Sequence, residues 1–228
     1  MGCTSMFVIA LVGLAMLLGV AWWGFGKIVN EYSSSQPAAV QTETTEADFA
    51  AANSKLNAVR EASRSNQPAS VEFTAAEINA LIARHADFKD LRGRFRVGMA
   101  NSEMTLDMSV PLAAIKLPRI RDRWLNGTAR FGLIYHDDNF SFSLRSLTAN
   151  GNDFSMRFLE GFATSFNEKF NEGFVKARRK TERSADFWES VKTLAVVDDK
   201  LVLTTIGAEA EDVDVPEEPE PTNPPQTL

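Results

Sequence analysis

The sequence predicts an α+β fold, in which an N-terminal transmembrane helix precedes an antiparallel β-meander sheet packed by helices on one side. Three observations predict it. A long uncharged apolar run opens the chain. Several later stretches alternate apolar and polar residues with a period of two, as antiparallel strands with one buried face do. Helical patterns precede and follow these strands in blocks, which is typical of α+β folds and not of alternating βαβ units.

The first element is a membrane anchor. A run of 20 almost wholly apolar, uncharged residues begins at Met6 and ends at Phe25. As a helix rising about 1.5 Å per residue, it spans the roughly 30 Å of a bilayer core. The run ends in aromatic residues and has no small-x-small cleavage site, which favours an uncleaved anchor over a signal peptide. We expect residues 1–27 to form a single transmembrane anchor, with Lys27 among the lipid headgroups.

A polar tether, residues 28–67, follows the anchor and contains a short amphipathic helix. Its apolar side chains recur at helical spacing, at Phe49, Ala52, Leu56 and Val59. This spacing predicts a helix over residues 46–63.

The main domain is expected over residues 68–206 and begins with a strand and a helix. Residues 71–73 have strand character. Thr74 and Glu77 then form a capping box, in which each side chain bonds the other residue's backbone N–H at the start of a helix. The apolar face of that helix consists of Ile78, Leu81 and Ile82.

Three hairpins supply the sheet. The first alternates apolar residues on both sides of a turn at Asn101 and Ser102. The second turns over residues 136–139, and its apolar positions face one another in pairs: Phe131, Leu133 and Tyr135 against Phe140, Phe142 and Leu144. The last pairs residues 194–197 with 201–206 around Asp198 and Asp199.

A helical stretch over residues 155–182, followed by a short helix over 185–192, carries a phenylalanine at every fourth position. The six rings are Phe154, Phe158, Phe162, Phe166, Phe170 and Phe174. Each four-residue step overshoots a helical turn by roughly 40°, so the first and last rings of a continuous helix point to opposite sides. Either a glycine breaks the helix, or part of this phenylalanine ladder faces a ligand, a partner or the bilayer. We expect Phe158, Phe162 and Phe166 to be buried and Phe174 to be more exposed than Phe162.

Charge is concentrated at the C-terminal end. The chain has 228 residues with 24 basic and 30 acidic side chains, and residues 207–228 hold seven of the acids and no base. This tail also carries five of the nine prolines and is expected to be disordered. Without it the chain is close to neutral, which argues against a nucleic-acid partner.

Several segments resemble a known family. They are Val-Glu-Phe-Thr-Ala-Ala-Glu-Ile-Asn-Ala-Leu-Ile at 71–82, Trp-Leu-Asn-Gly-Thr-Ala at 124–129 and Val-Val-Asp-Asp-Lys-Leu-Val-Leu at 196–203. Together, over about residues 70–205, they resemble the YpmS-like group of uncharacterised bacterial membrane-anchored proteins. The resemblance implies an extracytoplasmic domain tethered to the cell inner (plasma) membrane. It implies no catalytic residue.

No catalytic or metal-binding signature is present in the sequence. The two histidines, His85 and His136, are far apart, and the only cysteine, Cys3, precedes the anchor. A zinc site needs three or four ligands at characteristic spacing, and no phosphate-binding glycine loop or nucleophile motif occurs. We therefore expect no enzyme, no cofactor and no metal. We expect a module that binds a lipid or other envelope ligand, or alternatively an oligomerising scaffold of the envelope.

The surfaces that such a protein would use can be named. The phenylalanine ladder is the candidate ligand or partner surface. Basic residues form the candidate contacts with anionic headgroups, namely Lys27, Arg119, Arg121, Arg123, Arg178, Arg179 and Lys180. Ala15 and Gly19, a small-xxx-small pair in the anchor, would suit a homo-oligomer.

Overall fold

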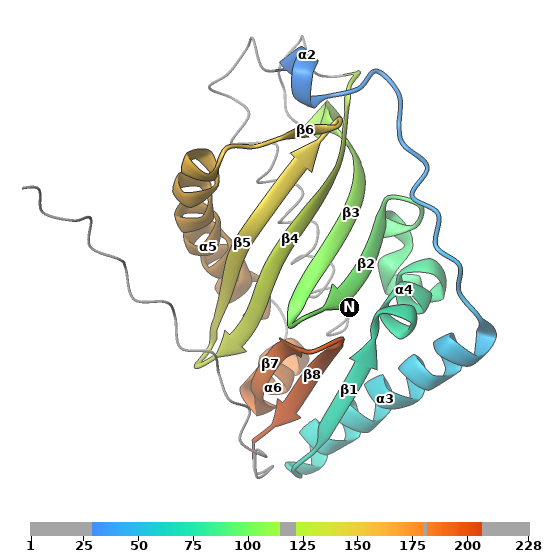
Figure 1. Ribbon diagram of the computed structural model, residues 1–228. Coiled ribbons are helices and arrows are strands. Elements are labelled where there is room, and N and C mark those ends of the chain that lie inside the picture. The colour runs from blue at the N-terminus through green and yellow to red at the C-terminus, as the bar shows by residue number, and fades with distance from the viewer. Residues whose placement is uncertain (1–28, 115–121, 180–181, 207–228) are drawn as a thin grey trace, which may run out of the picture.

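The computed structural model describes residues 29–114, 122–179 and 182–206 (Figure 1). The predicted anchor over residues 6–25 and the acidic tail over 207–228 lie outside these ranges. Within them, no helix is both long and apolar enough to cross a membrane.

The described residues form one antiparallel sheet with helices packed against it, which confirms the α+β class. The strands are β1 (Ser70–Thr74), β2 (Phe95–Ala100), β3 (Glu103–Pro111), β4 (Trp124–His136), β5 (Asn139–Ala149), β6 (Asn152–Asp153), β7 (Val191–Val197) and β8 (Lys200–Thr205). The helices are α2 (Val29–Tyr32), α3 (Glu46–Ser65), α4 (Ala75–Arg84), α5 (Met156–Arg178) and α6 (Glu182–Ser190), with 3-10 turns η2 (Ala86–Leu91) and η3 (Leu112–Ala114).

The order of strands departs from a simple meander. Strands β2 to β5 follow one another as predicted, but the last hairpin, β7–β8, inserts between β4 and β1. Strand β4 makes this possible because it is longer than its neighbours. Residues 124–131 of β4 pair with β3, and residues 134–136 pair with β7 on the same side. Strands β3 and β7 therefore lie on the same side of β4, next to different parts of its length, as Figure 1 shows.

Local sequence signals explain the helix starts and the turns. Both α3 and α4 begin with a capping box, at Thr45 and at Thr74, and the second is the one the sequence predicted. The β2–β3 turn holds two residues with positive φ, Asn101 and Ser102. This is the backbone of the two-residue hairpin turns that match strand twist.

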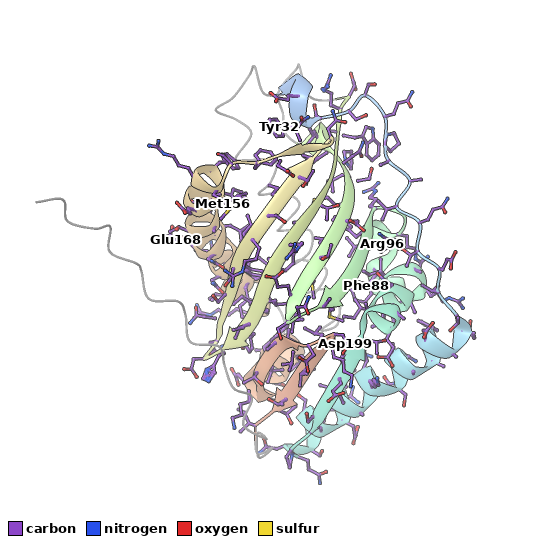
Figure 2. All side chains as sticks on the ribbon, in the orientation of Figure 1. Tyr32, Phe88, Arg96, Met156, Glu168 and Asp199 are labelled. Carbon is purple, nitrogen blue, oxygen red and sulfur yellow. The ribbon has the colours of Figure 1, made fainter. Side chains whose placement is uncertain are left out.

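Alternation along the strands separates a buried face from a polar one. In β3, Met104, Leu106 and Met108 are buried, while the residues between them are partly exposed. The polar face carries ion pairs such as Arg96 with Asp107, and Figure 2 shows Arg96 on β2. The helices cover the apolar face, so one core lies between them and the sheet.

The predicted burial of Phe162 and Phe166 in the phenylalanine ladder is confirmed, but the predictions for Phe158 and Phe174 are wrong. Helix α5 is continuous, yet Phe162, Phe166, Phe170 and Phe174 are all buried, and Phe174 is less exposed (4%) than Phe162 (8%). Phe158 is only half-buried. Two features outside the helix explain the difference. A twisted sheet rotates under a helix that lies along it, and α6 covers the far end of the ladder, where the Trp188 ring lies 5.1 Å from Phe174.

Asparagine side chains hydrogen-bond to the outer edges of two strands, β2 and β5. Asn79 of α4 accepts from the backbone N–H of Val97 on β2 and donates to its carbonyl, at 2.8 and 2.7 Å. Asn167 and Asn171 of α5 make the same two bonds to Phe142 and Phe140 on β5. Each carboxamide replaces a strand neighbour, which protects an exposed edge from pairing with another chain.

The first part of the expected tether is bound to the domain. Ser34 pairs with Trp124 through two backbone hydrogen bonds of 2.8 and 2.9 Å. Arg123 donates to the hydroxyl and carbonyl oxygens of Ser33, and Ala38 donates to the side chains of Ser109 and Asn126. The chain then runs alongside the sheet to α3 (Figure 1).

Candidate functional site

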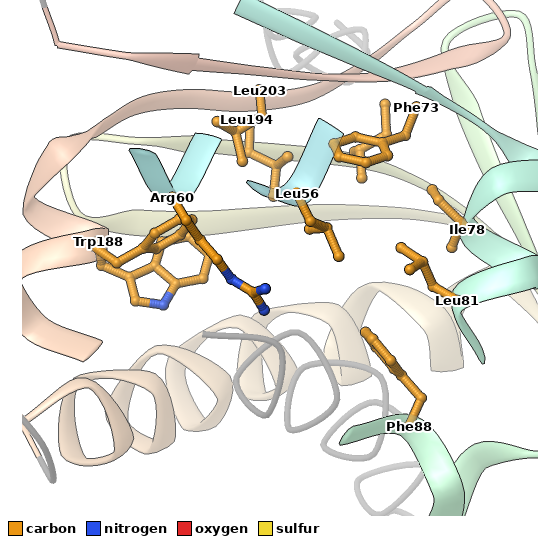
Figure 3. A pocket seen from close by; sticks show the side chains of 11 residues that line it. Leu56, Arg60, Phe73, Ile78, Leu81, Phe88, Trp188, Leu194 and Leu203 are labelled. Atoms are coloured by element: carbon orange, nitrogen blue, oxygen red, sulfur yellow. The ribbon is translucent and has the colours of Figure 1, made fainter. Parts of the chain in front are cut away.

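A pocket opens between the helices and the end of the sheet formed by β1, β8 and β7 (Figure 3). It encloses about 680 Å³ of empty space, including the part that is open to solvent. Its floor consists of four side chains from the three strands: Phe73, Leu194, Leu201 and Leu203. Phe73 pairs with Leu201, and Leu194 with Leu203, so these residues are cross-strand neighbours on one face of the sheet.

The walls of the pocket come from elements far apart in the chain. Leu56 and Arg60 belong to α3, and Phe187 and Trp188 to α6. On the other side stand Ile78 and Leu81 of α4 and Phe88 of η2. The capping box at Thr74 fixes the start of α4 directly after β1, which aims Ile78 and Leu81 at the pocket.

Arg60 is the one charged side chain in the pocket lining. It lies four residues after Leu56, so the two share a face of α3. Arg60 is half-buried, and Figure 3 shows its guanidinium pointing into the space between the apolar side chains. Its guanidinium donates a long hydrogen bond of 3.4 Å to Oδ1 of Asn57.

Trp188 closes the other wall and joins the pocket to the core. Its ring packs edge-on against Tyr135, Phe140 and Phe174, at centroid distances of 5.1 to 5.7 Å. The residue is 3% exposed, and its Nε1–H has no hydrogen-bond partner. A buried donor of this kind usually finds an acceptor, and leaving it unpaired costs about 1–3 kcal/mol.

The buried carboxylate nearest to the pocket is fully engaged. Glu77 accepts from Nζ of Lys55 at 2.6 and 2.8 Å and from the backbone of Thr74 at 2.8 Å. Lys55 also donates to the carbonyl oxygen of Glu72. These contacts hold α3, β1 and α4 together, so this ion pair supports the pocket walls.

A second polar cluster ties the β4–β5 turn to α5. Nη1 of Arg178 lies 2.5 Å from Oδ1 of Asp138, which also accepts from the Tyr135 hydroxyl at 3.1 Å. The Arg178 hydrogen bond lowers the pKa of Asp138 below its ordinary value. Burial, followed by the charge of Asp138, raises the pKa of Tyr135. Both groups therefore keep their usual charge state at neutral pH. The role of the cluster is structural, because it connects the β4–β5 turn to the end of α5.

The residues that the sequence singled out fall in different places. Lys27, Arg119, Arg121 and Lys180 lie outside the described residues. Arg123 is engaged by Ser33 and Arg178 by Asp138, while Arg179 caps α5 with an exposed side chain. Contact of these cations with headgroups stays a prediction. So does the phenylalanine ladder as a ligand surface, although the burial of four of its rings counts against it.

Sequence reasoning missed the pocket because its lining comes from seven elements. One local signal was available. Arg60 lies next to the apolar stripe of α3, one turn after Leu56, where a charged side chain is out of place.

No metal site emerges from the geometry. Within residues 29–114, 122–179 and 182–206, no group of three or more His, Cys, Asp or Glu side chains is close enough to hold an ion.

No family model, curated protein or solved structure shows detectable similarity to the chain. The resemblance to the YpmS-like group therefore stays a prediction.

Proposed function

We propose that this protein is a non-catalytic, single-pass membrane protein of the cell envelope whose extracytoplasmic domain binds a lipid in this pocket. The observation that supports it most is the pocket itself. Its lining has the character of small-molecule sites, which are mostly apolar with few polar groups. Protein interiors are otherwise packed as densely as organic crystals, so an open space lined by apolar side chains suits an occupant that enters from outside.

The lining favours holding a ligand over transforming it. Ten of its eleven side chains are hydrophobic, and an alkyl chain that enters gains about 0.8 kcal/mol per buried methylene group. The eleventh, Arg60, has a guanidinium that offers only N–H donors and no acceptor atom, so it is not suited to act as a general base. Within the lining, no nucleophile stands next to a base. A binding module is thus the function that these residues support best.

The position of the domain relative to the anchor fits this proposal. Ser33 is fixed to the sheet by Arg123, and it lies eight Cα–Cα steps after Phe25, the last residue of the predicted anchor. An extended chain of that length reaches at most about 29 Å. The domain therefore stays close to the bilayer, while the pocket lies toward the end of the sheet away from α2 (Figure 1). The resemblance to the YpmS-like group supports an extracytoplasmic domain.

Photolabelling with palmitic acid that carries a diazirine on its chain tests the proposal. We expect saturable labelling of the full-length protein in lipid nanodiscs. Leu56→Trp places an indole ring in the pocket lining and should reduce the saturable labelling at least tenfold. Ala58→Trp adds the same ring at an exposed position of α3 and should leave it unchanged. Thermal unfolding of each variant checks that it is folded.

Equal saturable labelling of both variants, or none in the parent protein, would contradict a lipid site in this pocket. A stable dimer together with absent labelling would favour the scaffold alternative instead.

A further inference from the structure

Arg60 is exceptional among the cations of the domain. Five lysine and arginine side chains are half-buried in the described residues: Lys55, Arg60, Arg123, Arg178 and Lys200. Three of them have an acidic partner: Lys55 pairs with Glu77, Arg178 with Asp138 and Lys200 with Glu72. Arg123 donates to two oxygens of Ser33. Arg60 alone of the five has no carboxylate partner and no hydrogen bond shorter than 3.4 Å, the length of its bond to Oδ1 of Asn57.

A half-buried guanidinium without an anionic partner carries a desolvation penalty, because it is partly removed from water and no carboxylate compensates its charge. The long bond to Asn57 offsets little of it. An anion that entered the pocket would supply the missing partner. The planar fork of an arginine matches the two oxygens of a carboxylate and binds them in parallel.

We infer that the ligand of this pocket is a single-chain amphiphile with one negative charge, a long-chain fatty acid, whose carboxylate binds Arg60 and whose alkyl chain fills the apolar remainder. This inference rests on the proposed function. A single cation balances a single charge, so a dianionic headgroup would leave charge uncompensated in an apolar site.

Competition experiments with the full-length protein in nanodiscs test the inference. Unlabelled palmitic acid and its neutral methyl ester each compete with the diazirine probe, and each competitor is compared between the parent protein and Arg60→Met. This substitution keeps a long side chain and removes the charge. A charge-assisted hydrogen bond corresponds to about a 10- to 100-fold effect. We expect the acid to lose that factor and the ester to lose less than threefold.

Arg64→Met is the matched control, because Arg64 lies one turn further along α3 with an exposed side chain. It should change neither competitor.

Equal loss of acid and ester in Arg60→Met, or no loss of either, would overturn the assignment of Arg60 while the lipid site stands. A probe that fails to label the parent protein would instead refute the proposed function, and the inference with it. Stronger competition by a long-chain amine than by the acid would also refute the anionic headgroup.

Discussion

Removal of the Asn79 side chain should strongly destabilise the domain. Asn79→Ala deletes both hydrogen bonds to Val97 and leaves a backbone N–H and a carbonyl of β2 without partners in a buried position. Each unsatisfied buried group costs about 1–3 kcal/mol. Alanine has a better helix propensity than asparagine, which stabilises the folded state by up to about 0.7 kcal/mol. The net loss in the free energy of unfolding is therefore about 2–5 kcal/mol.

Thermal unfolding of the full-length protein in a mild detergent, followed by circular dichroism, measures this loss. For a domain of this size it corresponds to a fall in Tm of roughly 6–20 °C. Asn57→Ala is the control, because it makes the same change at an exposed position of α3 and should be neutral or slightly stabilising. If Asn79→Ala cost no more than Asn57→Ala, the carboxamide would not be what closes this edge of the sheet.

Two further predictions concern the β4–β5 hairpin. A Cβ on Gly127 would lie 2.2 Å from a backbone oxygen of β5, whereas one on Gly132 would meet its nearest atom at 3.6 Å. Gly127→Ala should therefore lower the free energy of unfolding by about 3 kcal/mol or more, and Gly132→Ala by less than about 1 kcal/mol, in denaturant titration. Asp138 has a pKa lowered by Arg178 in the folded state, so its contribution to stability is present above its ordinary pKa of 3.8 and is lost as the pH falls through the lowered value. The advantage of the parent protein over Asp138→Asn should accordingly shrink between pH 6 and pH 2, and a gap that is constant over this range would exclude the ion pair as its source.

Sequence patterns predicted most of the secondary structure because the interactions behind it are local. The pairing of Leu133 with Phe142 and of Tyr135 with Phe140 was expected from alternation on either side of a turn, and the structure has this register. The capping box at Thr74 depends on four consecutive residues and is likewise present. Period and turn chemistry are sufficient at this level.

The phase of the phenylalanine ladder could not be predicted because it depends on what surrounds the helix. The helical geometry behind the prediction is sound, and Phe162 and Phe174 do point in different directions around a continuous α5. Burial follows from the neighbours, however. Tyr135 and Phe140 of the sheet and Trp188 of α6 surround the Phe174 ring. No single-helix argument contains these contacts.

The pocket and the strand order are properties of long-range topology. The β7–β8 hairpin pairs with both β4 and β1, which brings Leu194 and Leu203 beside Phe73 although more than a hundred residues separate them in the chain. A period-2 pattern indicates that a strand has one buried face. It does not indicate which helices leave that face uncovered.

Mass spectrometry of peptides can locate the adducts of the diazirine probe. This measurement tests directly whether a lipid site lies between α3, α6 and the β1–β8–β7 end of the sheet. We expect the saturable adducts to lie on lining residues of this pocket, such as Leu56, Phe187 and Leu203. Saturable adducts confined to peptides outside the pocket, such as those of the predicted anchor, would contradict it.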